Sequence, residues 1–111
     1  MAGGKTIEVS KRDSFKQELE KAGNNLVVVD FWASWCGPCM RIAPGYVKLS
    51  EDPAYANVVF LKVDVDNNDG VSDDAEITAM PTFQFYKNSA KIDEFKGASE
   101  DKLKEYLNKY K

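Results

Sequence analysis

Two cysteines three positions apart are the residues best suited to carry chemistry in this sequence. Cys36 and Cys39 are the only cysteines among the 111 residues, and the chain contains no histidine. Histidine is the usual general base of triad hydrolases and Cys–His proteases, and it is the commonest metal ligand, so those classes are excluded or disfavoured. The chemistry left to a pair of thiols is the reversible formation of a disulfide bond.

Two structural roles compete with redox chemistry for this pair. A purely stabilising disulfide would close a very short loop, contribute little entropy, and be unusual in a cytosolic protein. A structural zinc ion takes four ligands, so it would need a dimer that shares two cysteine pairs. Residues i and i+3 of a helix lie about 5–6 Å apart, within the Cα span of a disulfide, so the pair can open and close with little backbone movement. We therefore favour a redox pair.

The two thiols are expected to differ in reactivity. Cys36 falls at the predicted start of a helix, where unpaired N–H groups and the helix dipole favour a thiolate, so we expect it to attack. Cys39 lies one turn further along, is expected to be more buried, and would resolve the mixed disulfide. Gly37 leaves the Cys36 sulfur open to approach, and Pro38 fits the first helical turn.

One carboxyl group interrupts the apolar run 26–32. A buried Asp30 would have a raised pKa and could exchange protons near neutral pH, which makes it the candidate acid–base group that takes the proton of Cys39, through a water molecule. The alternative is a carboxylate at the exposed end of a strand. Lys62, on the next predicted strand, would modulate the pKa of Asp30 if it lies close by; as an ordinary surface lysine it would not.

Strands and helices alternate along the rest of the chain. The apolar patterns predict strands at 6–9, 26–32, 57–64, 82–86 and 91–96, and helices at 13–22, from the cysteine motif to 51, at 71–77, and from a cap at 99 onward. Ser10 and Asp13 are candidate N-caps of the first helix. We predict one α/β domain over residues 1–111, with a mixed, mainly parallel five-stranded sheet flanked on both faces by four helices.

Composition narrows the partners. The chain has 18 acidic and 15 basic residues, a net charge of −3, which argues against nucleic acid as the main partner. No apolar run approaches the ~20 residues of a membrane span. The segment 1–9 lacks the apolar region of a signal peptide, so the expected location is the cytoplasm.

The segment 29–39, Val-Asp-Phe-Trp-Ala-Ser-Trp-Cys-Gly-Pro-Cys, closely resembles the active-site segment of the thioredoxin family. The resemblance extends from about Ile7 to the last helix. Met80-Pro81-Thr82 matches the loop that carries a cis-proline in the family, Pro44 matches a helix-kinking proline, and Gly97-Ala98 matches the far lip of the substrate groove. Asp52-Pro53-Ala54 departs from the family pattern as a small insertion.

The resemblance implies a thioredoxin fold and reduction of protein disulfides by dithiol–disulfide exchange. It implies no cofactor beyond the Cys36–Cys39 disulfide, no metal, and regeneration by a flavin- and NADPH-dependent reductase. Pro81 would be cis, which would leave the backbone of Met80 free to pair with an extended substrate segment. The apolar contact surface for that substrate would comprise Trp35, Met80, Gly97 and Ala98, with Trp32 packed beneath the site.

Two rival functions remain open at this point. The first is a disulfide isomerase or oxidase, although that class usually carries Gly-His where this chain has Gly37-Pro38. A histidine there would stabilise the thiolate and make the pair more oxidising. The second rival is a non-catalytic scaffold subunit with the same fold, whose function would survive the loss of both cysteines.

Overall fold

A five-stranded sheet forms the centre of the computed structural model, which describes residues 4–111. The strands are β1 (Thr6–Glu8), β2 (Val27–Trp32), β3 (Val59–Asp64), β4 (Thr82–Lys87) and β5 (Ala90–Lys96), in the order β1-β3-β2-β4-β5. The pairs β1–β3 and β3–β2 are parallel, whereas β2–β4 and β4–β5 are antiparallel. The predicted mixed sheet is confirmed, and its parallel pairing is confined to β1, β3 and β2. The first three residues, part of the segment on which the predicted location rests, lie outside the described residues.

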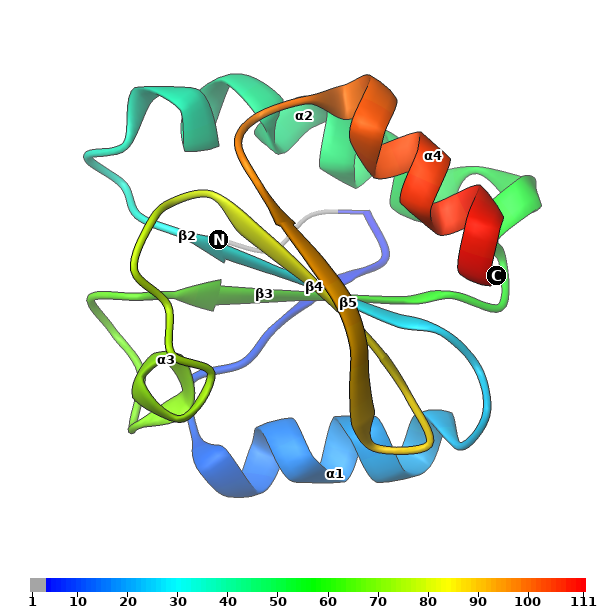
Figure 1. Ribbon diagram of the computed structural model, residues 1–111, viewed down its shortest axis with the longest axis horizontal. Coiled ribbons are helices and arrows are strands. Elements are labelled where there is room, and N and C mark those ends of the chain that lie inside the picture. Colours follow the sequence, from blue (N-terminus) through cyan, green and yellow to red (C-terminus); the bar gives the residue numbers. More distant parts are fainter. Residues whose placement is uncertain (1–3) are drawn as a thin grey trace.

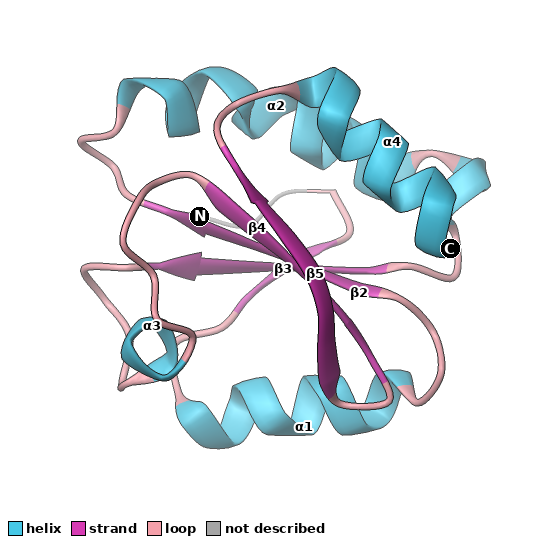
Figure 2. Cartoon of the chain, viewed as in Figure 1, coloured by secondary structure: helices cyan, strands magenta, loops and turns pink. Residues whose placement is uncertain are grey.

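Helices cover both faces of this sheet, as predicted. They are α1 (Arg12–Ala22), α2 (Gly37–Glu51), α3 (Val71–Asp74) and α4 (Glu100–Tyr110). Figures 1 and 2 show α2 and α4 together on one side of the strands, with α1 and α3 on the other. The cysteine motif therefore opens a helix that packs directly over the sheet.

The central strand β2 determines which groups lie beneath that helix. All six of its residues are buried. Successive side chains of a strand point to opposite faces, and Val28 belongs to the core cluster that contains residues of α2 and α4. Asp30 and Trp32 have the same parity as Val28, so both side chains lie on the α2 side of the sheet. Asp30 is thus placed below the helix that carries the cysteines.

The start of α1 corrects one prediction. The N-cap residue is Lys11, which makes no side-chain capping bond, so neither Ser10 nor Asp13 caps the helix. The backbone at Lys11 forms an isolated bridge with Asp69, and the carbonyl of Ser10 accepts a hydrogen bond from the Asp69 N–H at 2.6 Å. This pairing holds residues 10 and 11 in extended structure, and it places the helix start where no capping side chain is available.

The insertion at 52–54 is exposed and leads directly into a buried tyrosine. Residues Pro53–Tyr55 form a 3-10 helix, η1, whose N-terminus is capped by the Asp52 carboxylate at 2.8 Å from the N–H of Ala54. Tyr55 is buried in the cluster between the sheet and α2/α4, and its hydroxyl donates to the side-chain oxygen of Asn108 at 2.9 Å. Tyr55, directly after the insertion, therefore ties the end of α2 to α4.

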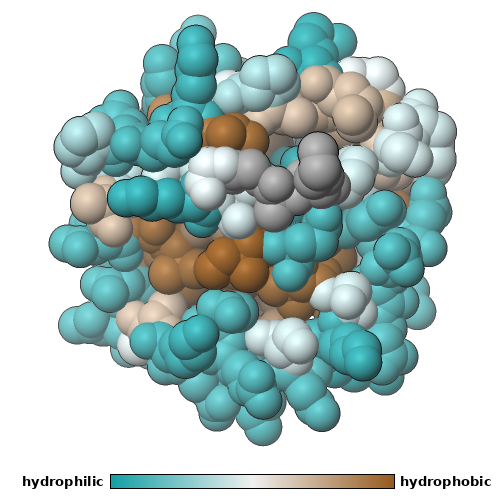
Figure 3. All heavy atoms as spheres, turned by 180° about the vertical axis from the view of Figure 1, so that it is seen from behind, coloured by the Kyte–Doolittle hydropathy of each residue, from teal (hydrophilic) through white to brown (hydrophobic). Residues whose placement is uncertain are grey.

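The surface is largely hydrophilic. Figure 3 shows the rear face, where hydrophobic side chains gather in a strip across the middle. No helix within residues 4–111 combines the length and apolar character needed to cross a bilayer. Four large hydrophobic side chains in this part of the chain are exposed, and two of them, Trp35 and Met40, flank the cysteine pair.

Candidate active site

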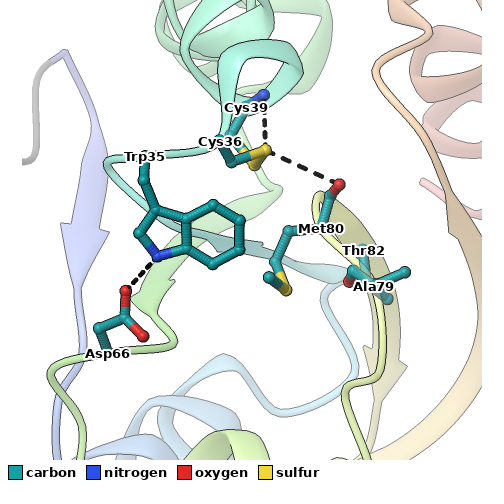
Figure 4. The surroundings of a disulfide bond; sticks show 7 residues. All are labelled: Trp35, Cys36, Cys39, Asp66, Ala79, Met80 and Thr82. Carbon is teal, nitrogen blue, oxygen red and sulfur yellow. Dashed lines mark hydrogen bonds between the residues drawn. A yellow bond between two sulfur atoms is a disulfide. The ribbon is translucent and has the colours of Figure 1, made fainter.

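Cys36 and Cys39 form a disulfide at the junction between β2 and α2. Their Cα atoms are 5.3 Å apart. Cys36 is the N-cap of α2, and its Sγ accepts a hydrogen bond from the backbone N–H of Cys39 at 3.2 Å (Figure 4). The predicted position of Cys36 at the mouth of a helix is confirmed. An N–H aimed at this sulfur, together with the helix dipole, favours the thiolate once the bond is reduced.

The two sulfurs are covered to different degrees. Cys36 is 6% exposed and Cys39 is 2% exposed, so the expectation that Cys39 is the more buried is confirmed. Gly37 and Pro38 between them are exposed. A Cβ atom added to Gly37 would meet nothing within 4 Å. The fold therefore does not itself require glycine here, and the approach to Cys36 is open on this side.

Trp35 has a partner that the sequence did not reveal. Its ring is 67% exposed, and its Nε1–H donates to Oδ2 of Asp66 at 2.6 Å (Figure 4). Trp32 and Asp64 are paired in the parallel register of β2 and β3. Residues shortly after these two strand ends therefore meet at the same edge of the sheet. The proximity of Trp35 and Asp66 therefore follows from the strand register and not from any sequence motif.

We expect Asp66→Ala to release the Trp35 ring without disturbing the fold. The indole N–H of Trp35 should then exchange faster with water, because the carboxylate oxygen that accepts its hydrogen bond is gone. Proton exchange measured by NMR checks this, with the indole N–H of buried Trp32 as an internal reference and Asp73→Ala as a control carboxylate variant. Unchanged exchange at Trp35 would contradict the assigned hydrogen bond.

The Met80–Pro81 loop lies beside the disulfide. The Met80–Pro81 peptide bond is cis, as the family resemblance implies. The carbonyl oxygen of Met80 lies 3.7 Å from Sγ of Cys36 (Figure 4). The loop is held by the Thr82 hydroxyl, which donates to the carbonyl of Ala79 at 2.6 Å. A backbone carbonyl is thus fixed next to the sulfur that we expect to react.

Gly97 and Ala98 reach the same loop from the end of β5. The N–H of Gly97 donates to the carbonyl of Pro81 at 2.9 Å. Gly97 is exposed, with φ of 106°, and Ala98 is half-buried against the core cluster under α2 and α4. The structure therefore brings Gly97 next to Pro81 and places Ala98 directly after it. Their contact with substrate stays a prediction.

Asp30 is buried, as predicted. It is 1% exposed, and neither of its carboxylate oxygens has a hydrogen-bond partner among the described residues. Burial raises the pKa of Asp30 to about 7; the charge of Lys62 acts in the opposite direction, and that of Glu8 raises the pKa further. The alternative of a carboxylate at an exposed strand end is wrong.

Lys62 is also buried rather than solvated, at 5% exposure. Its Cα is paired with that of Asp30 in the β2–β3 register. Its ammonium nitrogen lies 4.7 Å from the centre of the Trp32 ring. Trp32 itself packs with Ala33 and both cysteines, beneath the site as expected.

Tyr46 is a second residue that sequence reasoning missed. Its ring is fully buried, and its hydroxyl lies 3.2 Å from the carbonyl oxygen of Val28 and 2.7 Å from that of Leu61. The hydroxyl therefore ties α2 to both β2 and β3, one residue from Lys62 and two from Asp30 along those strands. The helical spacing of Ile42, Tyr46 and Leu49 is a signal that could have indicated burial of Tyr46, but its two carbonyl partners depend on the packed structure.

The cysteine site lies at the surface, between the exposed side chains of Trp35 and Met40. A pocket of about 470 Å³ lies on the other side of the sheet, between α1, α3 and β4, and none of its lining residues belongs to the cysteine site. Within residues 4–111, no three His, Cys, Asp or Glu side chains gather as they would around a metal ion. A reactive sulfur between exposed apolar side chains suits a disulfide carried by another macromolecule.

Comparison with known proteins assigns the family. A model of the thioredoxin family matches residues 6–109. The chain belongs to the thioredoxin family. The thioredoxin of Ictalurus punctatus is 51% identical over 105 residues, which cover 95% of this chain and 98% of that protein. The X-ray structure of Fasciola hepatica thioredoxin has a TM-score of 0.90 at 38% identity and covers 95% of this chain and 99% of its own.

A further structural match is a chain of a ferredoxin:thioredoxin reductase complex with thioredoxin f2. It has a TM-score of 0.87 at 34% identity, covering 98% of this chain and 97% of that one. The family and the disulfide in the thioredoxin active-site position identify the chemistry. This member of the family is a thiol–disulfide oxidoreductase that reduces protein disulfides, which confirms the predicted function and fold.

Proposed function

We propose that this protein is a cytoplasmic electron carrier in which Cys36 attacks the target disulfide and Cys39 releases the product. The observation that carries the assignment of roles is the Cys39 N–H, which donates to Sγ of Cys36 at the N-terminus of α2. That geometry stabilises negative charge on Cys36. Cys39 is more buried and lies where it can reach the sulfur of Cys36.

Two exchange steps transfer two electrons to the substrate. The thiolate of Cys36 attacks one sulfur of the target disulfide, which forms a mixed disulfide and releases the other target sulfur as a thiolate. Cys39 then loses its proton and attacks Sγ of Cys36. The mixed disulfide breaks, the Cys36–Cys39 disulfide forms, and the second target sulfur leaves as a thiolate. The substrate is reduced and this chain is oxidised.

Asp30 is our candidate for the group that accepts the proton of Cys39, through a water molecule. It lies on the α2 side of β2, and its pKa of about 7 lets it exchange protons near neutral pH. Lys62, paired with it in the register, modulates that pKa. No other acid–base group of similar pKa is needed for the second exchange step.

Substrate recognition is proposed for the loop and surface around Cys36. The fixed carbonyl of Met80, beside Sγ of Cys36, suits backbone pairing with an extended segment of the target. Around it, the apolar contact surface consists of Trp35, Met80, Gly97 and Ala98. A contact surface made of apolar side chains and backbone accepts many sequences, as a general reductant requires.

The proposed electron donor is a flavin-containing, NADPH-dependent thioredoxin reductase, and no further cofactor is required on this chain. Ferredoxin:thioredoxin reductase is a second candidate donor to compare directly, because the similar thioredoxin f2 structure was solved in complex with that enzyme. The cytoplasm is the proposed location, since a cytosolic thiol pool keeps such a pair available for reduction.

We expect insulin-dependent oxidation of NADPH when the oxidised chain is mixed with NADPH and the flavin-containing reductase. The loss of NADPH absorbance measures it, with photoreduced ferredoxin and ferredoxin:thioredoxin reductase as the parallel arm. Reduction by the ferredoxin system alone would contradict the proposed donor.

A reduction potential near the ~−180 mV of protein disulfide isomerase, rather than the ~−270 mV of thioredoxin, would support the isomerase rival instead.

A further inference from the structure

The ammonium group of Lys62 lies over the face of the Trp32 ring, although a carboxyl group is available nearby. Its nitrogen is 4.7 Å from the ring centre. The Cα atoms of Lys62 and Asp30 are direct partners in the sheet, and both side chains are buried. Yet neither oxygen of Asp30 has a hydrogen-bond partner among the described residues. The buried cation is therefore held by an aromatic ring rather than by the buried acid.

The Trp32 ring is fixed well enough to act as such a support. It is 8% exposed and packs with Ala33, Cys36 and Cys39. The negative face of an indole attracts a cation within about 6 Å of its centre, and the attraction strengthens when water is excluded. A buried tryptophan is thus the aromatic side chain best able to compete with a carboxylate for a lysine.

We propose that Trp32 is a positioning residue for the exchange reaction, because its indole face holds the Lys62 ammonium away from the Asp30 carboxyl group. The carboxyl group is thereby left able to take up and release the proton of Cys39. This inference rests on the proposed role of Asp30 and adds a residue to which neither the motif nor the family match assigns that role.

The charges around Asp30 make this arrangement effective. Lys62 acts on it from β3 and Glu8 from β1, while Tyr46 lies close to it on α2. On the β4 side, its register partner is the uncharged Phe83. Lys62 is the one cation that acts on Asp30 among the described residues. An ammonium in direct contact would favour the carboxylate and lower the pKa of Asp30, whereas over the ring it leaves burial dominant.

A double-mutant cycle measures the effect directly. The four proteins are the wild type, Trp32→Leu, Lys62→Met and the double variant, and the readout is the pKa of Asp30 from its carboxyl ¹³C titration. Trp32→Leu should lower that pKa by about one unit, because the freed ammonium moves to the carboxylate. In the Lys62→Met background the same substitution should change nothing. Equal shifts in both backgrounds, or no shift in the wild-type background, would overturn the proposal.

Two measurements keep the test decisive if Trp32→Leu does not fold. Trp32→Phe keeps a ring that attracts cations less strongly, so it should lower the pKa of Asp30 in the same direction by a smaller amount. In the wild type, the ε-methylene protons of Lys62 should show an upfield ring-current shift even where Asp30 is ionised. Absence of that ring-current shift would place Lys62 elsewhere and overturn the proposal.

The outcomes separate this inference from the function on which it rests. Asp30→Asn with normal turnover, together with a pKa cycle that behaves as expected, would remove Asp30 from the chemistry and leave the placement of Lys62 by Trp32 intact. Slow turnover in Asp30→Asn, together with a double-mutant cycle that shows no coupling, would keep Asp30 in the chemistry and overturn the placement of Lys62 by Trp32.

Discussion

Replacing Cys36 with serine should reduce the rate of insulin reduction to that of dithiothreitol alone. Serine has no thiolate at the mouth of α2, so no mixed disulfide can form and the first exchange step is lost. The turbidity of precipitating insulin chains measures the rate. Ser34→Ala is the matched control, because Ser34 is an exposed neighbour outside the cysteine pair and its replacement should leave the rate unchanged.

Replacing Cys39 should stop the reaction one step later. Cys36 would still attack, but nothing would displace the target, so a covalent complex through residue 36 should accumulate and be released by dithiothreitol. Mass spectrometry of the complex identifies the linked cysteine. A complex through Cys39 in the Cys36→Ser variant would reverse the assigned roles. A biological function that survives the loss of both cysteines would favour the scaffold rival.

Asp30→Asn should raise the free energy of unfolding most strongly above neutral pH. In the unfolded chain Asp30 ionises near its ordinary pKa of 3.8, whereas burial in the fold raises its pKa to about 7. Between these values the folded state holds more protons than the unfolded state, so the contribution of Asp30 to stability falls as pH rises. Above about pH 7 that loss reaches about 4 kcal/mol, the largest gain that the variant can show.

Urea unfolding across this pH range checks the expectation. The stability difference between Asp30→Asn and the wild type should grow from acidic to neutral pH and then level off. Asp73→Asn makes the same chemical change at an exposed site and should show no such trend. A pH-independent difference would mean that the Asp30 carboxyl group is not held protonated by the fold.

The same variant should turn over substrate more slowly. An asparagine cannot accept the proton of Cys39, so the second exchange step should slow by an amount at the low end of the ~10²–10⁴-fold typical of a general base. Insulin reduction followed as a function of pH measures it. Rates that match the wild type from about pH 6 to about pH 9 would remove Asp30 from the mechanism.

Local chemistry made much of the redox centre predictable. A CxxC pair next to an apolar strand predicts a helix N-terminus at Cys36, and a charge inside the run 26–32 predicts a buried Asp30. The neighbourhood of Met80-Pro81 and Gly97 came from the family resemblance, because no local pattern shows that two distant loops meet. The pairing of Gly97 with Pro81 confirms that they do.

Features that depend on the packed structure were missed. The Trp35–Asp66 hydrogen bond follows from the parallel register of β2 and β3. The carbonyl contacts of Tyr46 follow from how closely α2 packs against these two strands. The N-cap of α1 was predicted wrongly, because the pairing of Lys11 with Asp69 determines where that helix begins. In each case a long-range contact overrides the local preference.

The open space beside Gly37 separates the reduction potential of the cysteine pair from the stability of the fold, two properties that usually change together. A substitution at that position would change the surroundings of the neighbouring sulfur, yet the Cβ atom it adds would meet no other part of the chain within 4 Å. The reduction potential can therefore differ among related proteins of this fold with little effect on their folding. Position 37 is accordingly a place where the reduction potential of the cysteine pair can be tuned by design.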